Sequence, residues 1–247
     1  MKIFHQRLFS RFILREVTMD VYHPGISQLP LLLVNDGQDL PEMLEQGMPA
    51  VFIVAIHAGP KRRLEYGTAA EADYLGQGNR AADYTRFIME ELLPFLEKEY
   101  SNVTFTRRAF AGFSLGGLSA LDIVWQHPGI FSMAGVLSGA LWWRSHELNE
   151  DYNDHDHRIM HRLIREGDYH PGLQFFFQCG TADETDDRNN NGIIDSIDDT
   201  QDLMQELQQK GYRMDTDIHY LEIAGGRHDT ATWKTAFNTF LRLSYFS

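Results

Sequence analysis

Short apolar runs alternate along this chain with segments whose apolar residues have helical spacing. Leu31–Val34 and Val51–Ile56 are apolar throughout, which is typical of parallel strands buried on both faces. Residues 79–99 carry apolar side chains every three or four positions, which predicts a helix that Pro94 should kink. Strands that alternate with helices predict right-handed βαβ crossovers. We therefore expect an α/β fold with a mostly parallel central sheet and helices on both faces.

The remaining segments extend this pattern. Residues 8–23 alternate apolar and polar side chains, which predicts one or two antiparallel strands at the N-terminal side. Further strands are expected at Arg108–Phe113, Phe131–Leu137, Leu173–Cys179 and Ile218–Ile223. Further helices are expected at 115–126, 156–166, about 196–209 and 230–243.

One domain accounts for the whole chain, residues 1–247. Of its residues 43% are hydrophobic, enough for one large core, and no linker or internal repeat divides it. Residues 141–172 are aromatic, rich in histidine and irregular, so we expect a lid-like excursion there.

The charge of the chain restricts its partners. Lys and Arg total 22 against 35 Asp and Glu, a formal net charge of -13. Such a surface repels phosphate backbones and anionic membranes, so nucleic acid and membrane are poor candidate partners. The start of the chain has no signal-peptide pattern, and no apolar run reaches membrane-spanning length, which predicts a cytoplasmic protein. The oligomeric state is left open.

Gly112-Phe113-Ser114-Leu115-Gly116 has the G-x-S-x-G pattern of a nucleophile elbow. The motif closes a predicted strand and opens a predicted helix, so the turn should expose the Ser114 hydroxyl. The backbone N–H of Leu115 should then point at a developing oxyanion. A second N–H should come from a loop after an early strand, and Gln38 is our candidate.

A nucleophilic serine needs a general base and an acid that orients it. In the α/β-hydrolase order the acid precedes the histidine, which leaves His219 and His228. His219 lies inside a predicted strand, whereas His228 follows a strand in a loop, so His228 is the predicted base. Asp183 follows the strand 173–179 and is the predicted acid. Either of two later carboxylates, Glu184 and Asp186, could take its place.

Together these segments resemble a family of α/β-hydrolases. It includes enterobactin (siderophore) esterases, feruloyl and acetyl-xylan esterases, S-formylglutathione hydrolase and mycolyltransferases. Ala111–Gly117 resembles the family's elbow, and Leu32–Gln38 resembles its apolar strand ending in Asp-Gly. Ser138–Trp143 is similar to a stretch of siderophore esterases. Gly180–Asp183 and Gly225–Asp229 are similar to the acid and histidine segments of feruloyl esterases.

The resemblance covers about residues 12–243 and implies a carboxylic ester hydrolase that needs no cofactor for catalysis. It implies Ser114, Asp183 and His228 as the triad, and the amides of Gln38 and Leu115 as the oxyanion hole. The substrate would be a small siderophore-, feruloyl- or acetyl-type ester. Two alternatives stay open, an acyltransferase with the same triad and a catalytically silent carbohydrate-binding or scaffold protein.

Residues 187–198 match a twelve-residue calcium loop of the EF-hand type, with glycine at the sixth position. The expected oxygen ligands are Asp187, Asn189, Asn191, the Ile193 carbonyl, Asp195 and Asp198. We therefore expect a structural Ca²⁺ here, of modest affinity because two of the ligands are uncharged.

Other signals are weaker. Trp142 and Trp143 could line a substrate pocket, and Arg62 could border it, although an ion pair is the more ordinary role for Arg62. His157 and His161 would lie one turn apart on the predicted helix 156–166. With the acidic and histidine residues at 154–156 they could form a transition-metal site for a metal-dependent hydrolase, although a polar lid surface is the more ordinary interpretation.

Overall fold

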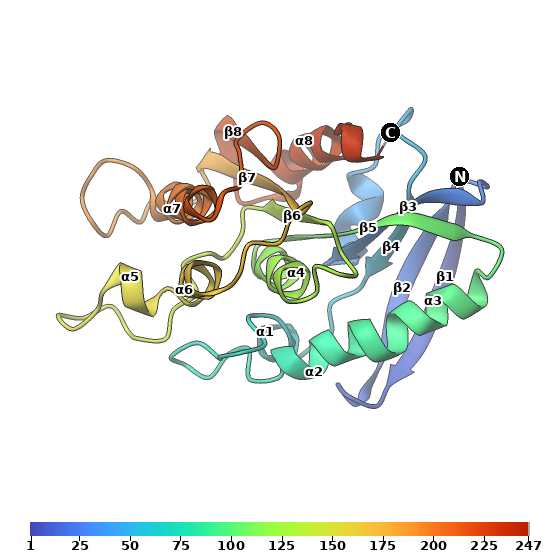
Figure 1. Cartoon of the computed structure of the whole chain (residues 1–247), viewed down its shortest axis with the longest axis horizontal. Helices are drawn as coiled ribbons and strands as arrows, with labels where there is room; N and C mark the ends of the chain where they lie inside the picture. The colour runs from blue at the N-terminus through green and yellow to red at the C-terminus, as the bar shows by residue number, and fades with distance from the viewer. Residues whose placement is uncertain (247) are drawn as a thin grey trace.

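The computed structural model describes residues 1–246, and its centre is one eight-stranded sheet (Figure 1). The strands are β1 (Lys2–Ser10), β2 (Arg15–His23), β3 (Gln28–Asn35), β4 (Phe52–Ile56), β5 (Thr104–Phe113), β6 (Met133–Leu137), β7 (Gln174–Ala182) and β8 (Ile218–Arg227). Their order is β1-β2-β4-β3-β5-β6-β7-β8. β2 pairs antiparallel with β1 and β4, and the other neighbours pair in parallel. The predicted mostly parallel sheet with antiparallel N-terminal strands is confirmed.

Helices cover both faces of this sheet, as Figure 1 shows for α8 on one side and α4 with the α2–α3 run on the other. The α-helices are α1 (Arg62–Glu65), α2 (Ala81–Arg86), α3 (Leu93–Glu99), α4 (Leu115–Gln126), α5 (Asp154–His157), α6 (Ile159–Glu166), α7 (Asp195–Lys210) and α8 (Thr230–Leu241). A π-helical segment, η2 (Phe87–Leu92), joins α2 to α3. Two 3₁₀ helices are η1 (Gly37–Glu42) and η3 (Ser244–Phe246).

The alternation of side chains along each strand divides the core in two. Leu31 and Leu33 of β3 belong to the cluster under α2, α3 and α4, whereas Leu32 and Val34 belong to the cluster under α8 and η1. Successive strand residues point to opposite faces, so a strand covered on both sides must be apolar at every position. This is the physical reason for the unbroken apolar run at 31–34.

The helical run 81–99 continues through Pro94 without a break. Proline lacks the N–H that would donate to the carbonyl four residues earlier, and its ring collides with that carbonyl. The helix widens to π spacing over Phe87–Leu92, immediately before the α3 turn that contains Pro94. The wider turn shifts the hydrogen-bond pattern around the proline, so the run continues instead of breaking.

The predicted helix 156–166 is interrupted. α5 ends at His157, and Arg158 has an extended backbone (φ -76°, ψ 107°) before α6 begins at Ile159. The Arg158 guanidinium donates to Asp199 and Asp202 of α7, at 2.7 Å each. These ion pairs hold Arg158 against α7 at the break, a tertiary contact that helical spacing does not reveal.

Among residues 1–246, no helix combines the length and the hydropathy needed to span a lipid bilayer.

Candidate active site

Three side chains from the carboxyl edge of the sheet line one small chamber. Ser114 directly follows β5, Asp183 directly follows β7 and His228 directly follows β8. The chamber has a volume of about 40 Å³, and its walls also include Ser138 and Trp142. Parallel strands bring their carboxyl ends to the same edge, which is where α/β sheets bind ligands. One site therefore contains Ser114, Asp183 and His228, although they are far apart in the sequence.

The backbone of Ser114 is held in a sparsely populated conformation, with φ 55° and ψ -125°. The turn is tight because a Cβ on Gly112 would collide with the carbonyl of Gly116, and a Cβ on Gly117 would crowd the Gly112 carbonyl. Only glycine permits this approach of strand to helix. Strain of this kind persists where surrounding structure enforces it, and it commonly marks functional residues.

His228 sits at the rim of the chamber, with its ring 5.1 Å from that of Trp233 in an edge-on arrangement. The Trp233 Nε1–H donates to Ser138 Oγ at 2.9 Å, which ties the start of α8 to the end of β6. Burial lowers the pKa of His228 below its ordinary value; the Asp183 charge opposes this shift and the Arg62 charge adds to it. The imidazole is therefore held mainly in its neutral, proton-accepting form near neutral pH.

Asp183 has one occupied and one free carboxylate oxygen. Oδ2 accepts the backbone N–H of Gly180 at 3.0 Å, which orients the carboxylate. Oδ1 is buried and has no hydrogen-bond partner within residues 1–246. A buried acceptor without a donor is costly. Asp183 Oδ1 is thus free to accept a further hydrogen bond, and His228 lines the same chamber as Asp183.

The two predicted oxyanion donors lie on segments that pack together. Leu115 is the first residue of α4, so its N–H has no acceptor inside that helix. Gln38 lies in η1, just after Asn35 and Asp36. The Asn35 side-chain amide donates to the Gly116 carbonyl at 2.9 Å, and a Cβ on Gly116 would meet the Asp36 carboxylate. The loop carrying Gln38 is thereby fastened to the start of α4.

Arg62 does not line the chamber that contains Ser114. Its guanidinium forms two 2.6 Å hydrogen bonds with the buried Asp36 and a longer one with the Phe113 carbonyl, which joins the end of β3 to the elbow. Trp142 lines the chamber and is 37% exposed. Trp143 is fully buried, against the backbone at Gly67 and Gly78. The two tryptophans thus have different surroundings.

A second cavity of about 280 Å³ adjoins the chamber, and Trp142 and Glu184 belong to the walls of both. The further lining residues are Asp73, Tyr74, Leu75, Gln77, Arg144, Leu148, Asp186 and Asp195. Residues 73–77 and Arg144 were not predicted from the sequence as site residues. They lie in irregular loops that match no motif, and the glycines at 67, 76 and 78 were the only local sign of a specially shaped segment.

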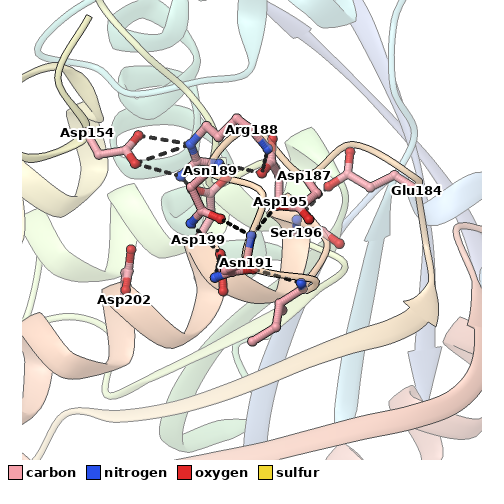
Figure 2. A network of polar contacts seen from close by, with 12 residues as sticks. Asp154, Glu184, Asp187, Arg188, Asn189, Asn191, Asp195, Ser196, Asp199 and Asp202 are labelled. Carbon is pink, nitrogen blue, oxygen red and sulfur yellow. Dashed lines mark hydrogen bonds and ion pairs between the residues drawn. The ribbon is translucent and has the colours of Figure 1, made fainter.

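The loop 187–198 begins just beyond Asp183 and leads into α7 (Figure 2). Asp187 accepts the backbone N–H groups of Asn191 and Gly192, at 3.1 and 2.9 Å. The side-chain amides of Asn189 and Asn191 both donate to Asp198 Oδ2, at 2.9 and 2.8 Å. Four of the predicted ligands therefore converge. Asp195 instead accepts the Arg188 N–H at 2.9 Å.

Arg188 connects this loop to two other elements (Figure 2). Its guanidinium contacts Asp154 of α5 at 3.0 Å and the buried Asp199 of α7 at 2.5 Å. Asp199 also accepts from Arg158. The excursion 141–172 and the loop 187–198 are thus both anchored to α7 through buried charge pairs.

The candidate transition-metal cluster does not assemble. Within residues 1–246, no three His, Cys, Asp or Glu side chains are grouped closely enough to hold a metal ion. His157 stacks on His146 with ring centroids 3.9 Å apart, whereas His161 is buried and bonded to the Asp199 carbonyl. The break at Arg158 separates the two histidines, so the alternative of a helical pair of metal ligands is wrong.

Two curated proteins are similar in sequence to parts of this chain. The chain is 29% identical over 140 residues to the uncharacterized protein YbbA of Bacillus subtilis, which covers 50% of this chain and 55% of that protein. It is 35% identical over 69 residues to a siderophore enterobactin esterase of Emericella nidulans, covering 28% of this chain and 23% of the relative. The chain thus spans about half or less of these relatives.

Solved structures share the fold at low sequence identity. The enterobactin esterase of Shigella flexneri superposes with a TM-score of 0.71 at 18% identity, over 98% of this chain and 58% of that one. The siderophore hydrolase EstB from Aspergillus nidulans superposes with a TM-score of 0.66 at 18% identity, over 96% and 93%. A family model described as "Putative esterase" matches residues 13–243, nearly the whole chain. The chain therefore belongs to this esterase family of the α/β-hydrolase fold.

Proposed function

We propose that this protein hydrolyses carboxylic esters, with Ser114 as nucleophile, His228 as general base and Asp183 as the acid that orients His228. The observation that supports this most directly is the chamber at the carboxyl edge of the sheet, which all three side chains line. Ser114 has the strained backbone of a nucleophile elbow. Family membership points to the same chemistry.

The first half of the reaction transfers the acyl group to the enzyme. Ser114 Oγ attacks the ester carbonyl carbon while His228 accepts the Oγ proton. The carbonyl oxygen becomes an oxyanion, which the backbone N–H groups of Leu115 and Gln38 stabilise. The tetrahedral intermediate then collapses, the C–O bond to the alcohol breaks, and His228 returns the proton to the leaving alcohol.

The second half releases the acid. Water loses a proton to His228 and attacks the acyl-enzyme carbonyl, and the proton then returns to Ser114 as the C–O bond to the serine breaks. Throughout, the free Oδ1 of Asp183 would accept the N–H of His228 and stabilise the imidazolium. The structural neighbours are esterases of enterobactin and ferulic acid, so siderophore-, feruloyl- and acetyl-type esters are the classes to assay.

Replacing Ser114 by alanine tests the proposal. We expect kcat/KM for p-nitrophenyl acetate to fall by roughly 10³–10⁶-fold, because the nucleophile is gone while the fold remains. A fluorophosphonate probe should label the unmodified protein and not the variant. Ser101→Ala is the matched control, since Ser101 is exposed and precedes β5, away from the strand's carboxyl end.

Two outcomes would contradict the proposal in different ways. Full ester turnover by Ser114→Ala would exclude the serine mechanism. Failure of the probe to label Ser114, together with no turnover of any ester, would favour a catalytically silent carbohydrate-binding or scaffold protein. Product analysis with an added alcohol distinguishes hydrolysis from acyl transfer, because a transferase would form the new ester in place of the free acid.

We also propose that the loop 187–198 binds one Ca²⁺. The side chains at 187, 189, 191 and 198 converge, and Gly192 supplies the positive φ of 87° that the turn requires. The Ile193 carbonyl and Asp195 would complete the oxygen set, which suits a hard cation. Because no three carboxylates of the described residues are grouped before an ion binds, Asp195 would have to move from Arg188 toward the cation. Arg188 partly neutralises Asp195, which favours modest affinity.

Calorimetric titration and melting curves with CaCl₂ after chelator treatment test this site. We expect measurable heat and a rise in melting temperature, both lost in Asp187→Asn. Asp168→Asn, at an exposed position outside the loop, should behave as the unmodified protein. If the unmodified protein gives no heat and no shift at millimolar calcium, the loop is an Asn-Gly turn and not a cation site.

A further inference from the structure

The chamber over Ser114 is too small to hold an ester by itself. Its volume of about 40 Å³ is close to the roughly 30 Å³ that one water molecule occupies in the liquid. The adjoining cavity of about 280 Å³ is near the lower end of ordinary ligand pockets. Trp142 and Glu184 border both spaces, so a substrate bonded to Ser114 must extend past them.

This adjoining cavity is strongly acidic. Four carboxylates line it, against one guanidinium, that of Arg144. The Arg144 guanidinium lies over the rings of Tyr74 and Trp142, 5.5 and 5.7 Å from their centroids. One of the carboxylates, Asp195, is paired with Arg188 at 3.2 Å. Even with that pair discounted, the cavity carries an excess of negative charge.

One of the carboxylates, that of Asp73, has a buried oxygen without a hydrogen-bond donor among the described residues. Asp73 is only 5% exposed; its Oδ1 accepts the N–H groups of Leu75 and Gln77, while its Oδ2 has no partner within the described chain. Glu184 borders both spaces, and its Oε1 accepts the backbone N–H of Ser196. Carboxylates accept hydrogen bonds and cannot donate them, so a ligand that satisfies this wall must bring donors and no negative charge.

We propose that this cavity selects esters whose bulk is rich in hydrogen-bond donors and free of negative charge, and that it rejects polyanionic esters. The inference rests on the proposed ester hydrolysis and narrows its substrate class. A group carrying hydroxyls or an ammonium would contact the carboxylates while it packs on Trp142. A polyanionic ester, such as an iron-loaded catecholate, would meet like charges at short range, which is unfavourable.

Matched esters that differ only in charge test the selection. We would compare p-nitrophenyl esters of a hydroxylated acid, an acid that bears a primary ammonium group and a carboxylate-bearing acid, all of similar size. A second set varies the alcohol in the same way on one acyl group. We expect kcat/KM for the anionic member to be at least about ten-fold below that of the hydroxylated one, and the gap to narrow in high salt. The hydroxylated and ammonium members separate the two sources of donors.

Two substitutions should shift this discrimination in opposite directions. Asp186→Asn should raise the ratio of anionic to neutral turnover by about two- to five-fold, and Arg144→Gln should lower it by a similar factor. Asp168→Asn and Arg213→Gln, both at exposed positions outside the cavity, are the matched controls and should leave the ratio unchanged.

Binding to Ser114→Ala separates this inference from the proposed function. Calorimetry on that variant measures affinity for the intact esters without turnover. Weaker binding of the anionic member supports the inference even if the chemistry proves different. Equal or tighter binding of the anionic member, or a ratio that neither cavity substitution shifts, would overturn it.

Discussion

At the scale of single residues, His228 and Asp183 determine how the proposed reaction responds to pH. Burial lowers the pKa of His228 below its ordinary value of about 6.5. The base works only when neutral, so a lowered pKa extends activity toward acid. We expect kcat/KM to be level near pH 7 and to fall only below about pH 6.5, with the inflection marking the His228 pKa. A pH–rate profile with its acid inflection above that value would contradict this.

Replacing Asp183 by asparagine should act in two measurable ways. The charge of Asp183 supports the protonated form of His228, so its loss should move the acid inflection to still lower pH. Without the carboxylate the imidazolium that forms during the reaction is also no longer stabilised, so kcat should fall by roughly 10³–10⁴-fold. Glu184→Gln is the informative comparison. If it and not Asp183→Asn produced the large loss, Glu184 would be the orienting acid.

At the scale of elements, buried charge pairs attach the excursion 141–172 to α7. The Asp199 side chain is 1% exposed and contacts Arg158 and Arg188, which are themselves 7% and 14% exposed. Removing one partner of a buried ion pair leaves an uncompensated charge, which is far more costly than losing a surface pair. The position of the excursion therefore depends on Asp199.

We expect Asp199→Asn to lower the free energy of unfolding by on the order of 3 kcal/mol. Asp202 also pairs with Arg158, but its side chain is 43% exposed, so Asp202→Asn should cost less than about 1 kcal/mol. Urea denaturation at neutral pH measures both. Equal losses in the two variants would show that burial of Asp199 is not what matters.

At the scale of the whole molecule, the net charge of -13 should make stability depend on salt. Like charges repel in the compact state, and salt screens that repulsion. If screening contributes about 1 kcal/mol, raising NaCl from about 10 to 200 mM should raise the melting temperature by roughly 2–4 °C. Scanning calorimetry with a chelator present, so that loop 187–198 cannot bind calcium, measures the effect. A falling melting temperature would show that favourable ion pairs outweigh the repulsion.

The strands, most of the helices and the three proposed catalytic residues were predicted from short sequence patterns. A strand covered on both faces must be apolar throughout, and a nucleophile elbow requires Gly112 beside Ser114 because no Cβ fits there. Both constraints act over a few residues and are visible in the sequence itself. The break at Arg158 and the π-helical segment before Pro94 were not predicted, because a partner on α7 and the missing N–H of the proline change the backbone in ways that helical spacing does not show.

What the sequence determined by itself was therefore the α/β architecture and the segments that meet at the carboxyl edge of the sheet. Only the tertiary structure brought residues 73–77, Arg144 and Glu184 to one cavity beside Ser114, and it turned Trp142 toward that cavity and Trp143 into the core. The physical reason is that strands and helices obey short-range periodicity. A cavity formed by loops depends on long-range packing, in which each loop is placed by partners distant in sequence.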